Sequence, residues 1–403
     1  MTISRRALLG TAAAATLPAS LARAQAPVLK IGVLTDLSGP YQDIAGPLSG
    51  LAAQMAGSEF GSKAFKVEVL TADHQNKADV GVALARQWFD RDGVDMVIDL
   101  ANSGVSLAVA GVAKEKNKVC VSTGAATSDM TGKACNTNTI HWVYDTYMLA
   151  RSTGGAMTKA GGDTWFFITA DYAFGHSLSR DVGNFVKAAG GKVLGEVRTP
   201  FPGTTDFSAF LLQAQSSGAK VIGLANAGAD TINTIKQARE FGITQKLGGL
   251  LVFLSDVHSL GLPVAQGLVL TESFYWDLNP GTRAFSERFK PMAPSKRPTM
   301  VHAGNYSCVL HYLKAANAMG VAEAKKDGAA TVAAMKAMPT EDDCFGKGTV
   351  RADGRKLHPS YLFEVKKPAE SKGPWDYYKL LATTPADEAF RPLGDGGCSM
   401  VKA

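Results

Sequence analysis

The chain has 403 residues and a formal net charge of +6 at pH 7, with 46% hydrophobic and 19% charged residues. This length exceeds the usual size of one domain and favours two lobes, and the composition excludes a disordered or fibrous chain. Neither a basic run nor basic residues interleaved with aromatic ones occur, so we expect no nucleic-acid partner.

The first 26 residues, MTISRRALLGTAAAATLPASLARAQA, have the layout of an export signal. Arg5 and Arg6 precede an Ala- and Leu-rich core and resemble a twin-arginine signal. Cleavage after Ala26 is favoured over cleavage after Ala24, because PVLKIGVL then begins the mature fold. Removing three arginines lowers the formal charge from +6 to +3 (6 − 3). No later stretch approaches the roughly 20 apolar residues that span a bilayer, so we expect a periplasmic protein.

Five cysteines suit an oxidising compartment, where disulfides form. We expect Cys120 to pair with Cys135 across a short loop, and Cys344 to pair with Cys398 and hold the C-terminal tail. Cys308 is then a buried free thiol. The spacings Cys-x-x-Cys and His-x-x-x-His are absent, so neither a metal site nor a cofactor is expected.

From Val28 onward, short runs rich in Val and Ile alternate with longer helical patterns. The predicted strands are VLKIGVL, KVEVLTAD, VDMVID, KVCVSTG, TWFFITAD, KVIGLAN, LGGLLVF and GLVLTESF. Continuous apolar strands spaced by helices are typical of parallel sheets covered on both faces. The fold class is therefore α/β, with a doubly wound parallel sheet in each of two lobes.

The alternation restarts after residue 143, which divides the chain into two units of one design. We expect lobe 1 to contain residues 27–143 and 275–346, and lobe 2 to contain residues 144–274 and 347–403. The chain returns at TESFYWDLNPGTRAFSERF, because helical patterns follow at 281–294, 302–320 and 328–338. A third crossing after Gly346 leads to SYLFEV, so three crossing strands form the hinge.

Two neighbouring strand ends in lobe 1, ANSGVS (101–106) and STGAATSD (122–129), combine small residues with hydroxyl and amide side chains. In an open parallel sheet, ligands bind beyond the carboxyl ends of the strands, where helices present free N–H groups. Two such corners can hold a carboxylate without Arg or Lys. We therefore expect Asn102, Ser103 and Thr127 in the site, although each is also explained as a helix N-cap.

Aromatic residues are expected to pack on the body of the ligand. Tyr172 and Phe174 follow a lobe 2 strand in ADYAFGHS (170–177), and Tyr41 follows Ser38-Gly39-Pro40 in lobe 1. Ordinary core packing is the alternative for each of them.

Two further lobe 2 corners, LANAGADT (224–231) and VFLSDVHS (252–259), offer polar groups for the other end of the ligand. We expect Asn226 or Asp256 there, since a ligand ammonium requires an acidic partner. Asp230 opens a helical pattern and is interpreted as a helix cap.

Three segments together resemble the periplasmic solute-binding proteins of the branched-chain amino-acid type in ABC uptake systems. They are KIGVLTDLSGPYQDIAGPLSGLAAQMA, VDMVIDLANSGVSLAVAGVAKEKNKVCVSTGAATSDMTG and ADYAFGHSLSRDV. The resemblance extends over essentially the whole mature chain and implies the type I periplasmic binding protein fold. It also implies that a Ser-containing corner and an Ala-Ala-Thr corner hold the ligand carboxylate, which assigns Ser103, Ala125, Ala126 and Thr127.

Amino-acid binders of this family also carry an acidic residue in the second lobe, and neither Asp230 nor Asp256 matches that pattern convincingly. This departure leaves open an acid without an amine, such as an aromatic or short-chain acid. We expect a monomer without enzymatic activity that captures a small carboxylate-containing solute for an inner-membrane ABC permease. A ligand-sensing regulatory subunit of the same fold is one alternative, and a secreted hydrolase using His258 and Asp256 is another.

Overall fold

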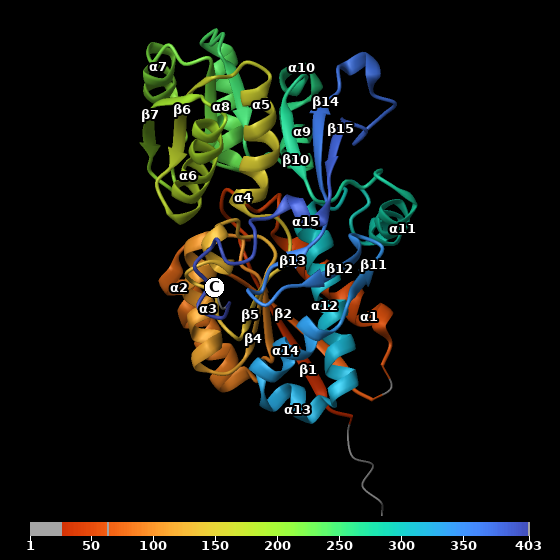
Figure 1. Cartoon of the computed structure of the whole chain (residues 1–403). Coiled ribbons are helices and arrows are strands. Elements are labelled where there is room, and N and C mark those ends of the chain that lie inside the picture. The colour runs from red at the N-terminus through yellow and green to blue at the C-terminus, as the bar shows by residue number, and fades with distance from the viewer. Residues whose placement is uncertain (1–25, 63, 402–403) are drawn as a thin grey trace, which may run out of the picture.

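The computed structural model describes residues 26–62 and 64–401, which form two lobes stacked one above the other (Figure 1). The predicted export signal therefore lies outside the described residues, except for Ala26. Within the described part, no helix combines the length and apolarity needed to cross a membrane.

Lobe 1, the lower lobe in Figure 1, is built on a parallel five-stranded sheet in the order β2-β1-β3-β4-β5. Its strands are β1 (Val28–Thr35), β2 (Lys66–Asp73), β3 (Met96–Asp99), β4 (Val119–Ser122) and β5 (Thr139–His141). The helices are α1 (Pro47–Phe60), α2 (Ala78–Gln87), α3 (Ser103–Glu115), α12 (Met300–Met319), α13 (Val321–Lys326) and α14 (Gly328–Ala337). Every residue of β3 and β4 is buried, as expected for strands covered on both faces.

Lobe 2 contains a second parallel sheet in the order β7-β6-β8-β9. Its strands are β6 (Thr164–Ala170), β7 (Lys192–Thr199), β8 (Val221–Ala225) and β9 (Lys246–Gly249). The helices are α4 (Thr146–Leu149), α5 (Gly155–Lys159), α6 (Ala173–Ala188), α7 (Ser208–Ser216), α8 (Ala229–Glu240), α9 (Leu254–Leu260) and α10 (Leu262–Ala265). The predicted α/β class with two lobes is confirmed.

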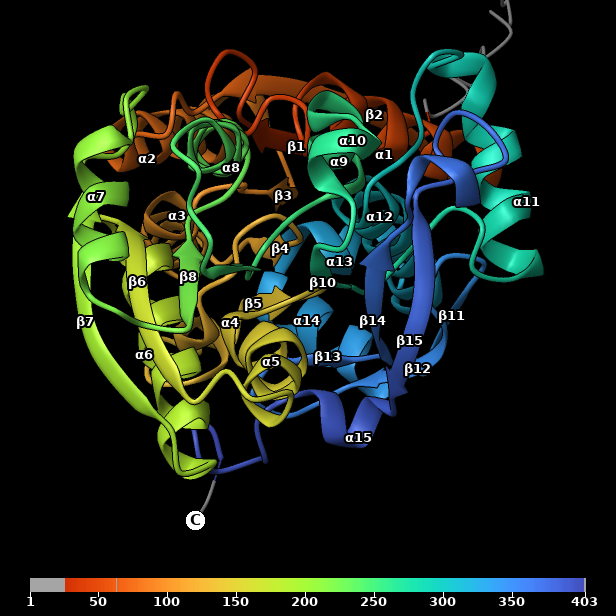
Figure 2. The same cartoon turned by 90° about the horizontal axis from the view of Figure 1, so that it is seen from above.

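A separate antiparallel sheet, β10-β14-β15, flanks lobe 2 on the side opposite β7 (Figure 2). Its strands are β10 (Val269–Glu272), β14 (Ser360–Val365) and β15 (Tyr378–Thr384). The strand GLVLTESF was expected to be parallel, but its partner β14 arrives from the opposite direction after the last crossing and pairs antiparallel.

The three crossings expected for the hinge are present, and the tail passes between the lobes a fourth time. The chain crosses at 142–145, at 273–279 before α11 (Pro280–Phe289), and at 358–359. The small sheet of β11 (Thr340–Asp342), β12 (Gly346–Val350) and β13 (Lys356–Leu357) lies beside β5 in lobe 1, where Arg355 bridges His141. After β15 and α15 (Ala386–Ala389), the tail 390–401 returns to lobe 1. The expectation that 347–403 lies wholly in lobe 2 therefore differs from the structure.

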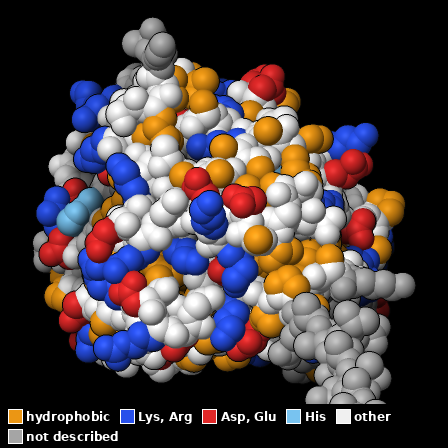
Figure 3. Space-filling view, turned by 90° about the horizontal axis from the view of Figure 1, so that it is seen from below, with side chains coloured by type: hydrophobic (Ala, Val, Ile, Leu, Met, Phe, Trp, Pro, Cys, Tyr) orange, Lys and Arg blue, Asp and Glu red, His pale blue; other side chains and the backbone are white. Residues whose placement is uncertain are grey.

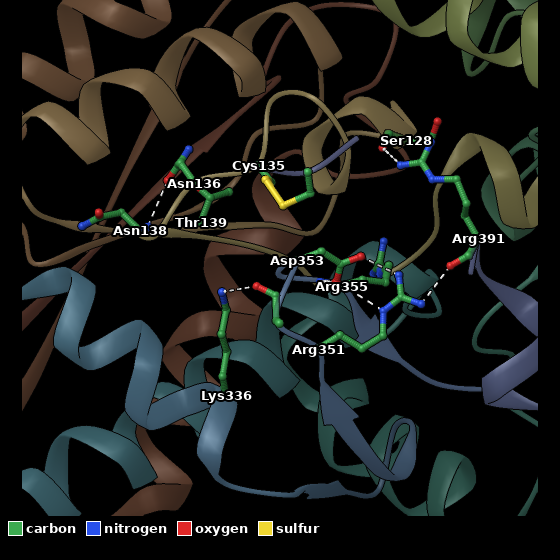
Figure 4. Close-up of a disulfide and its surroundings, with 12 residues drawn as sticks. Ser128, Cys135, Asn136, Asn138, Thr139, Lys336, Arg351, Asp353, Arg355 and Arg391 are labelled. Atoms are coloured by element: carbon green, nitrogen blue, oxygen red, sulfur yellow. Dashed lines mark hydrogen bonds and ion pairs between the residues drawn. A yellow bond between two sulfur atoms is a disulfide. The ribbon is translucent and has the colours of Figure 1, made fainter. Parts of the chain in front are cut away.

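The tail is held to lobe 1 by a disulfide between Cys135 and Cys398, whose Cα atoms are 5.6 Å apart (Figure 4). The predicted pairings Cys120–Cys135 and Cys344–Cys398 are both wrong, because the sequence did not reveal that the tail returns to lobe 1. Cys120 lies inside the buried strand β4 and is a free thiol, as is buried Cys344. The prediction of a buried free thiol at Cys308 is confirmed.

Two buried side chains, Arg355 and His358, bond the first crossing segment at the hinge. The guanidinium of Arg355 is fully buried and donates a hydrogen bond to the carbonyl of Val143 at 2.6 Å. The ring of His358, on the third crossing, lies 2.9 Å from the same carbonyl. One backbone carbonyl of the first crossing is thus shared by Arg355, just before β13 in lobe 1, and by His358 on the third crossing.

The outer end of lobe 1, seen from below in Figure 3, carries Lys and Arg side chains with Asp and Glu side chains between them. Such a mixture of both signs is typical of a solvated protein face.

Candidate functional site

A small cavity of about 10 Å³ lies where the two lobes meet. Its walls are formed by Tyr41, Ile44, Ala101, Ser103, Gly124, Ala125, Ala126, Tyr144, Tyr172, Phe174, Ala227 and Leu251. The lining is mainly apolar, with hydroxyl groups from one serine and three tyrosines. Because both lobes contribute walls, the lobes enclose whatever occupies this space.

The first corner of lobe 1 places Ser103 on the cavity wall. Asp99 (φ 76°), the last residue of β3, and Leu100 (φ 59°), the next residue, lie in the left-handed region, which non-glycine residues rarely adopt. Asn102 caps α3, because its side chain accepts a hydrogen bond from the Val105 N–H at 3.1 Å. The capping alternative therefore describes Asn102, whereas Ser103 faces the cavity.

The second corner follows β4 and is bonded to the first. The hydroxyl oxygen of Ser103 accepts hydrogen bonds from the N–H groups of Ala126 at 3.3 Å and Thr127 at 3.2 Å. Glycine is required at position 124, since a Cβ there would lie 2.7 Å from a carboxylate oxygen of Asp99. The structure therefore brings the two predicted corners together at one end of the cavity.

Thr127 itself does not line the cavity. Its hydroxyl lies 2.8 Å from the hydroxyl of Ser177, which belongs to α6 of lobe 2. This hydroxyl pair links the second corner directly to the opposite lobe.

Aromatic rings from both lobes close one side of the cavity, as the sequence predicts for Tyr41, Tyr172 and Phe174. The hydroxyls of Tyr41 and Tyr172 are 2.6 Å apart across the lobe boundary. Phe201 stacks on both rings, with centroid distances of 5.3 Å to Tyr41 and 4.4 Å to Tyr172. Burial raises the pKa of both tyrosine hydroxyls, which stay protonated and available as donors.

The loop that presents Tyr41 is organised by Asp36, a fully buried carboxylate. Its oxygens accept hydrogen bonds from the N–H groups of Gly39 at 2.7 Å and Tyr41 at 2.8 Å, and from the side-chain amide of Asn76 at 2.7 Å. This carboxylate fixes the loop conformation and thereby the position of the tyrosine.

Two predicted ligand residues of lobe 2 lie away from the cavity wall. The side chain of Asn226 bonds the hydroxyls of Thr231 at 2.7 Å and Thr234 at 3.1 Å, inside the first turns of α8. Asp256 accepts a hydrogen bond from the Phe253 N–H at 2.9 Å and caps α9. Both side chains form hydrogen bonds at the start of the helices that follow their strands, α8 and α9.

The pair proposed for a hydrolase does not assemble either. Asp256 is occupied by its capping bond, while the ring of His258 stacks on Trp375 at a centroid distance of 3.9 Å. The same ring bonds the hydroxyl of Tyr377 at 2.8 Å. The two side chains thus serve different parts of lobe 2.

Sequence reasoning missed Tyr144, whose hydroxyl donates to the carbonyl of Gly124 at 2.5 Å. This residue comes from the first crossing segment, which the strand-end rule does not examine. Sequence reasoning also missed four wall residues that are small or aliphatic and carry no distinctive pattern: Ile44, Ala101, Ala227 and Leu251.

Asp230 is the most informative difference from the sequence interpretation. Helix α8 is capped by Gly228, so Asp230 is not its cap. The side chain is 3% exposed, and its Oδ2 has no hydrogen-bond partner among the described residues. Desolvation raises its pKa to about 7, and its charge contributes to the raised pKa of Tyr41 and Tyr172. A buried carboxylate therefore lies close to the tyrosine pair without a compensating charge.

Within residues 26–62 and 64–401, no three His, Cys, Asp or Glu side chains are grouped as metal ligands would be. The side-chain polar groups at the cavity wall are hydroxyls, which can hydrogen-bond an organic ligand.

Residues 28–374 match the model of the periplasmic binding protein family. A crystal structure of a periplasmic binding protein from Burkholderia mallei is 48% identical, with a TM-score of 0.90, and the match covers 94% of this chain and 100% of that one. A branched-chain amino-acid ABC transporter periplasmic ligand-binding protein from Burkholderia xenovorans is 42% identical, with a TM-score of 0.80 and coverage of 92% and 99%.

A more distant similarity concerns the fold alone. A solute-binding protein of an ABC transporter from R. palustris, solved in complex with benzoate, is 21% identical, with a TM-score of 0.80 and coverage of 92% and 99%.

Proposed function

Because the chain belongs to the periplasmic binding protein family, we propose that it is the solute-binding component of an ABC importer. It captures a small carboxylate-containing solute between its lobes and delivers it to an inner-membrane permease. The observation that carries this proposal is the cavity walled by both lobes, with the Tyr41 and Tyr172 hydroxyls meeting across it. Ligand contacts from both sides favour the closed form through differential affinity.

The carboxylate of the ligand is assigned to the end of the cavity where the two lobe 1 corners meet. Ser103 begins α3, whose first N–H groups lie at the positive end of the helix dipole. Its hydroxyl, now accepting from Ala126 and Thr127, can turn to donate to a carboxylate oxygen and release those two N–H groups to the same ligand.

The buried Asp230, whose charge acts on the Tyr41 and Tyr172 hydroxyls of the cavity wall, supports an amino acid over a simple acid. A ligand ammonium near Asp230 would supply the counter-charge that this buried carboxylate lacks. The 42% identical protein named for branched-chain amino acids agrees with this choice, and the apolar walls suit an aliphatic side chain. The benzoate-bound neighbour makes an aromatic acid the alternative.

A thermal-shift screen of the mature protein tests the proposal. Candidates are branched-chain and other amino acids, benzoate and hydroxybenzoates, and short-chain acids, because a ligand that binds only the folded form raises its apparent stability. A hit is then titrated calorimetrically. Saturable binding of one of these acids supports the proposal, and no binding by any of them contradicts it.

Export is tested separately. The layout of residues 1–26 supports a periplasmic location with cleavage after Ala26. Amino-terminal sequencing of the protein from a periplasmic extract is expected to begin at Pro27, and replacing Arg5 and Arg6 with Lys is expected to retain the precursor in the cytoplasm.

A further inference from the structure

Ser128 joins the cavity corner of lobe 1 to lobe 2. It begins the short helix η2 (Ser128–Thr131), directly after Thr127. Its N–H donates to the Thr146 hydroxyl at 3.1 Å and its hydroxyl donates to Asp181 at 2.8 Å, and both partners belong to lobe 2 helices. The Thr146 hydroxyl donates to the same carboxylate oxygen of Asp181 at 2.6 Å. These groups are buried, so their hydrogen bonds are shielded from water.

Hydrogen bonds from Arg180 lie beside this cluster and add to the contact between the lobes. Arg180 of α6 reaches across to Asp129, with 3.1 Å between guanidinium nitrogen and carboxylate oxygen, and to the Ser128 hydroxyl at 3.0 Å. The bond between Thr146 and Asp181 joins α4 to α6 within lobe 2, and the other contacts connect the η2 loop of lobe 1 with α4 or α6. Movement of α4 and α6 away from lobe 1 would break these other contacts.

The η2 loop is supported from behind by the C-terminal tail (Figure 4). The guanidinium of Arg391 donates to the carbonyl of Ser128 at 2.9 Å, and the Arg391 carbonyl accepts from Arg351 at 2.8 Å. Gly132 and Gly396 let the two segments approach closely, since a Cβ on Gly132 would lie 2.7 Å from the Gly396 carbonyl oxygen.

The Cys135–Cys398 disulfide then closes the same loop covalently onto the tail. The backbone groups of Ser128 are thus held from both sides, by lobe 2 through its N–H and by the tail through its carbonyl. None of Ser128, Arg391 and the two cysteines is a wall of the cavity.

We propose that the C-terminal tail is a positioning element for lobe closure: Arg391 and the disulfide hold the η2 loop where Ser128 and Asp129 can bond α4 and α6. The tail thereby increases the closed population and the ligand affinity without touching the ligand. This inference deepens the proposed function, because affinity falls in proportion to the fraction of molecules that can close.

The test measures the open and closed populations by single-molecule FRET in the full mature protein. Dyes are attached through non-cysteine chemistry at Lys66 of lobe 1 and Leu212 of lobe 2, both exposed. Without any ligand, Arg391→Met and the double variant Cys135→Ser/Cys398→Ser are each expected to lower the closed-to-open ratio by about tenfold, the first through loss of a charge-assisted hydrogen bond and the second through loss of the covalent link. Arg391→Lys is expected to restore part of the ratio, because it keeps a donor.

Arg288→Gln is the matched control. Arg288 pairs with Glu59 at 2.9 Å and Asp343 at 3.0 Å inside lobe 1, so its loss is expected to lower stability without changing the ratio. If the tail variants lower the unfolding temperature but leave the ratio equal to that of the native protein, the tail only stabilises lobe 1 and the inference is overturned. This outcome is independent of the ligand's identity, and a failed ligand screen leaves the measured ratio intact.

Discussion

The hydroxyl of Tyr41 in lobe 1 lies 2.6 Å from that of Tyr172 in lobe 2, and both rings stack on Phe201. These rings pack over the cavity, so removing one exposes the bound ligand. Tyr172→Ala is expected to weaken ligand binding by roughly 1–3 kcal/mol, the value of a buried aromatic face. Tyr172→Phe keeps the ring and is expected to lose only about 1 kcal/mol. Calorimetric titration of both variants with the ligand from the screen checks this, and an unchanged affinity in Tyr172→Ala would remove the ring from the site.

The carboxylate assignment predicts the effect of removing two hydroxyls. Ser103→Ala/Thr127→Ala is expected to abolish the thermal stabilisation given by the ligand, because one donor and the support of the second corner are lost. Ser103→Ala/Thr127→Ser restores the hydroxyl that bonds Ser177 and is expected to recover part of the shift. A double alanine variant with the full ligand-dependent shift would place the carboxylate elsewhere.

Asp230 predicts a pH dependence of stability. Its pKa is about 7 in the folded protein and about 3.9 in the unfolded chain, so the unfolded state releases this proton first as pH rises. The free energy of unfolding of the ligand-free protein is therefore expected to fall between about pH 4 and pH 7, by on the order of 3 kcal/mol for this group. Asp230→Asn is expected to remove that part of the slope in urea unfolding measured at several pH values.

Asp256→Asn is the matched control for the ligand. Asp256 is buried with a pKa of about 7, but unlike Asp230 its carboxylate is already bonded to the Phe253 N–H in the cap of α9, so it contributes a similar stability slope without needing an ammonium partner. Asp230→Asn is expected to weaken binding of an amino acid by more than tenfold and to spare a plain acid, whereas Asp256→Asn is expected to spare both. Equal affinities in all three proteins would contradict an ammonium partner at Asp230.

A side chain at Gly228 is expected to hinder closure of the two lobes. A Cβ on this lobe 2 residue would lie 2.3 Å from the carbonyl oxygen of Pro40 in lobe 1, a contact made across the cleft. Gly228→Ala is expected to lower ligand affinity by at least tenfold, since the clash arises when the lobes come together. Gly242→Ala introduces a Cβ at another positive φ, 63°, with nothing within 4 Å, and serves as a control without a clash. Equal ligand affinities in the two variants would argue against the clash.

The disulfide predicts the number of titratable thiols. Cys120, Cys308 and Cys344 are buried and free, so Ellman's reagent is expected to find almost no thiol in the native protein and three after denaturation without reductant. The two disulfides expected from the sequence would leave one free thiol, Cys308. Peptide mapping without reduction is expected to recover the fragment that links Cys135 and Cys398.

Sequence reasoning anticipated more of the lobe 1 residues on the cavity wall than of the lobe 2 residues. The corners at Ser103 and Ala125–Ala126 follow from a general rule, because the carboxyl ends of adjacent parallel strands meet at one sheet edge. Tyr41 and Tyr172 were found because aromatic residues stand beside glycines after predicted strands. Tyr144 and Leu251 have no such local signal, since they reach the cavity only through the path of the chain between lobes.

The errors at Asp230 and at the disulfide have a common physical origin. An acidic residue in the first turn of a helix is often a cap, and its lack of a partner becomes visible only once the neighbouring lobe surrounds it. Strand β7 escaped prediction because its residues are alternately exposed and half-buried at a sheet edge. The pairing of Cys135 with Cys398 depends on a fourth crossing that no local pattern in the tail specifies.

The bond between Cys135 and Cys398 also determines how the molecule would carry mechanical tension. The two sulfurs are separated by 263 positions in sequence, so a pull applied at the chain ends passes directly from one cysteine to the other. The whole of lobe 2 lies between the two cysteines in sequence. In optical tweezers it would bear no force and remain folded until a reductant breaks the disulfide.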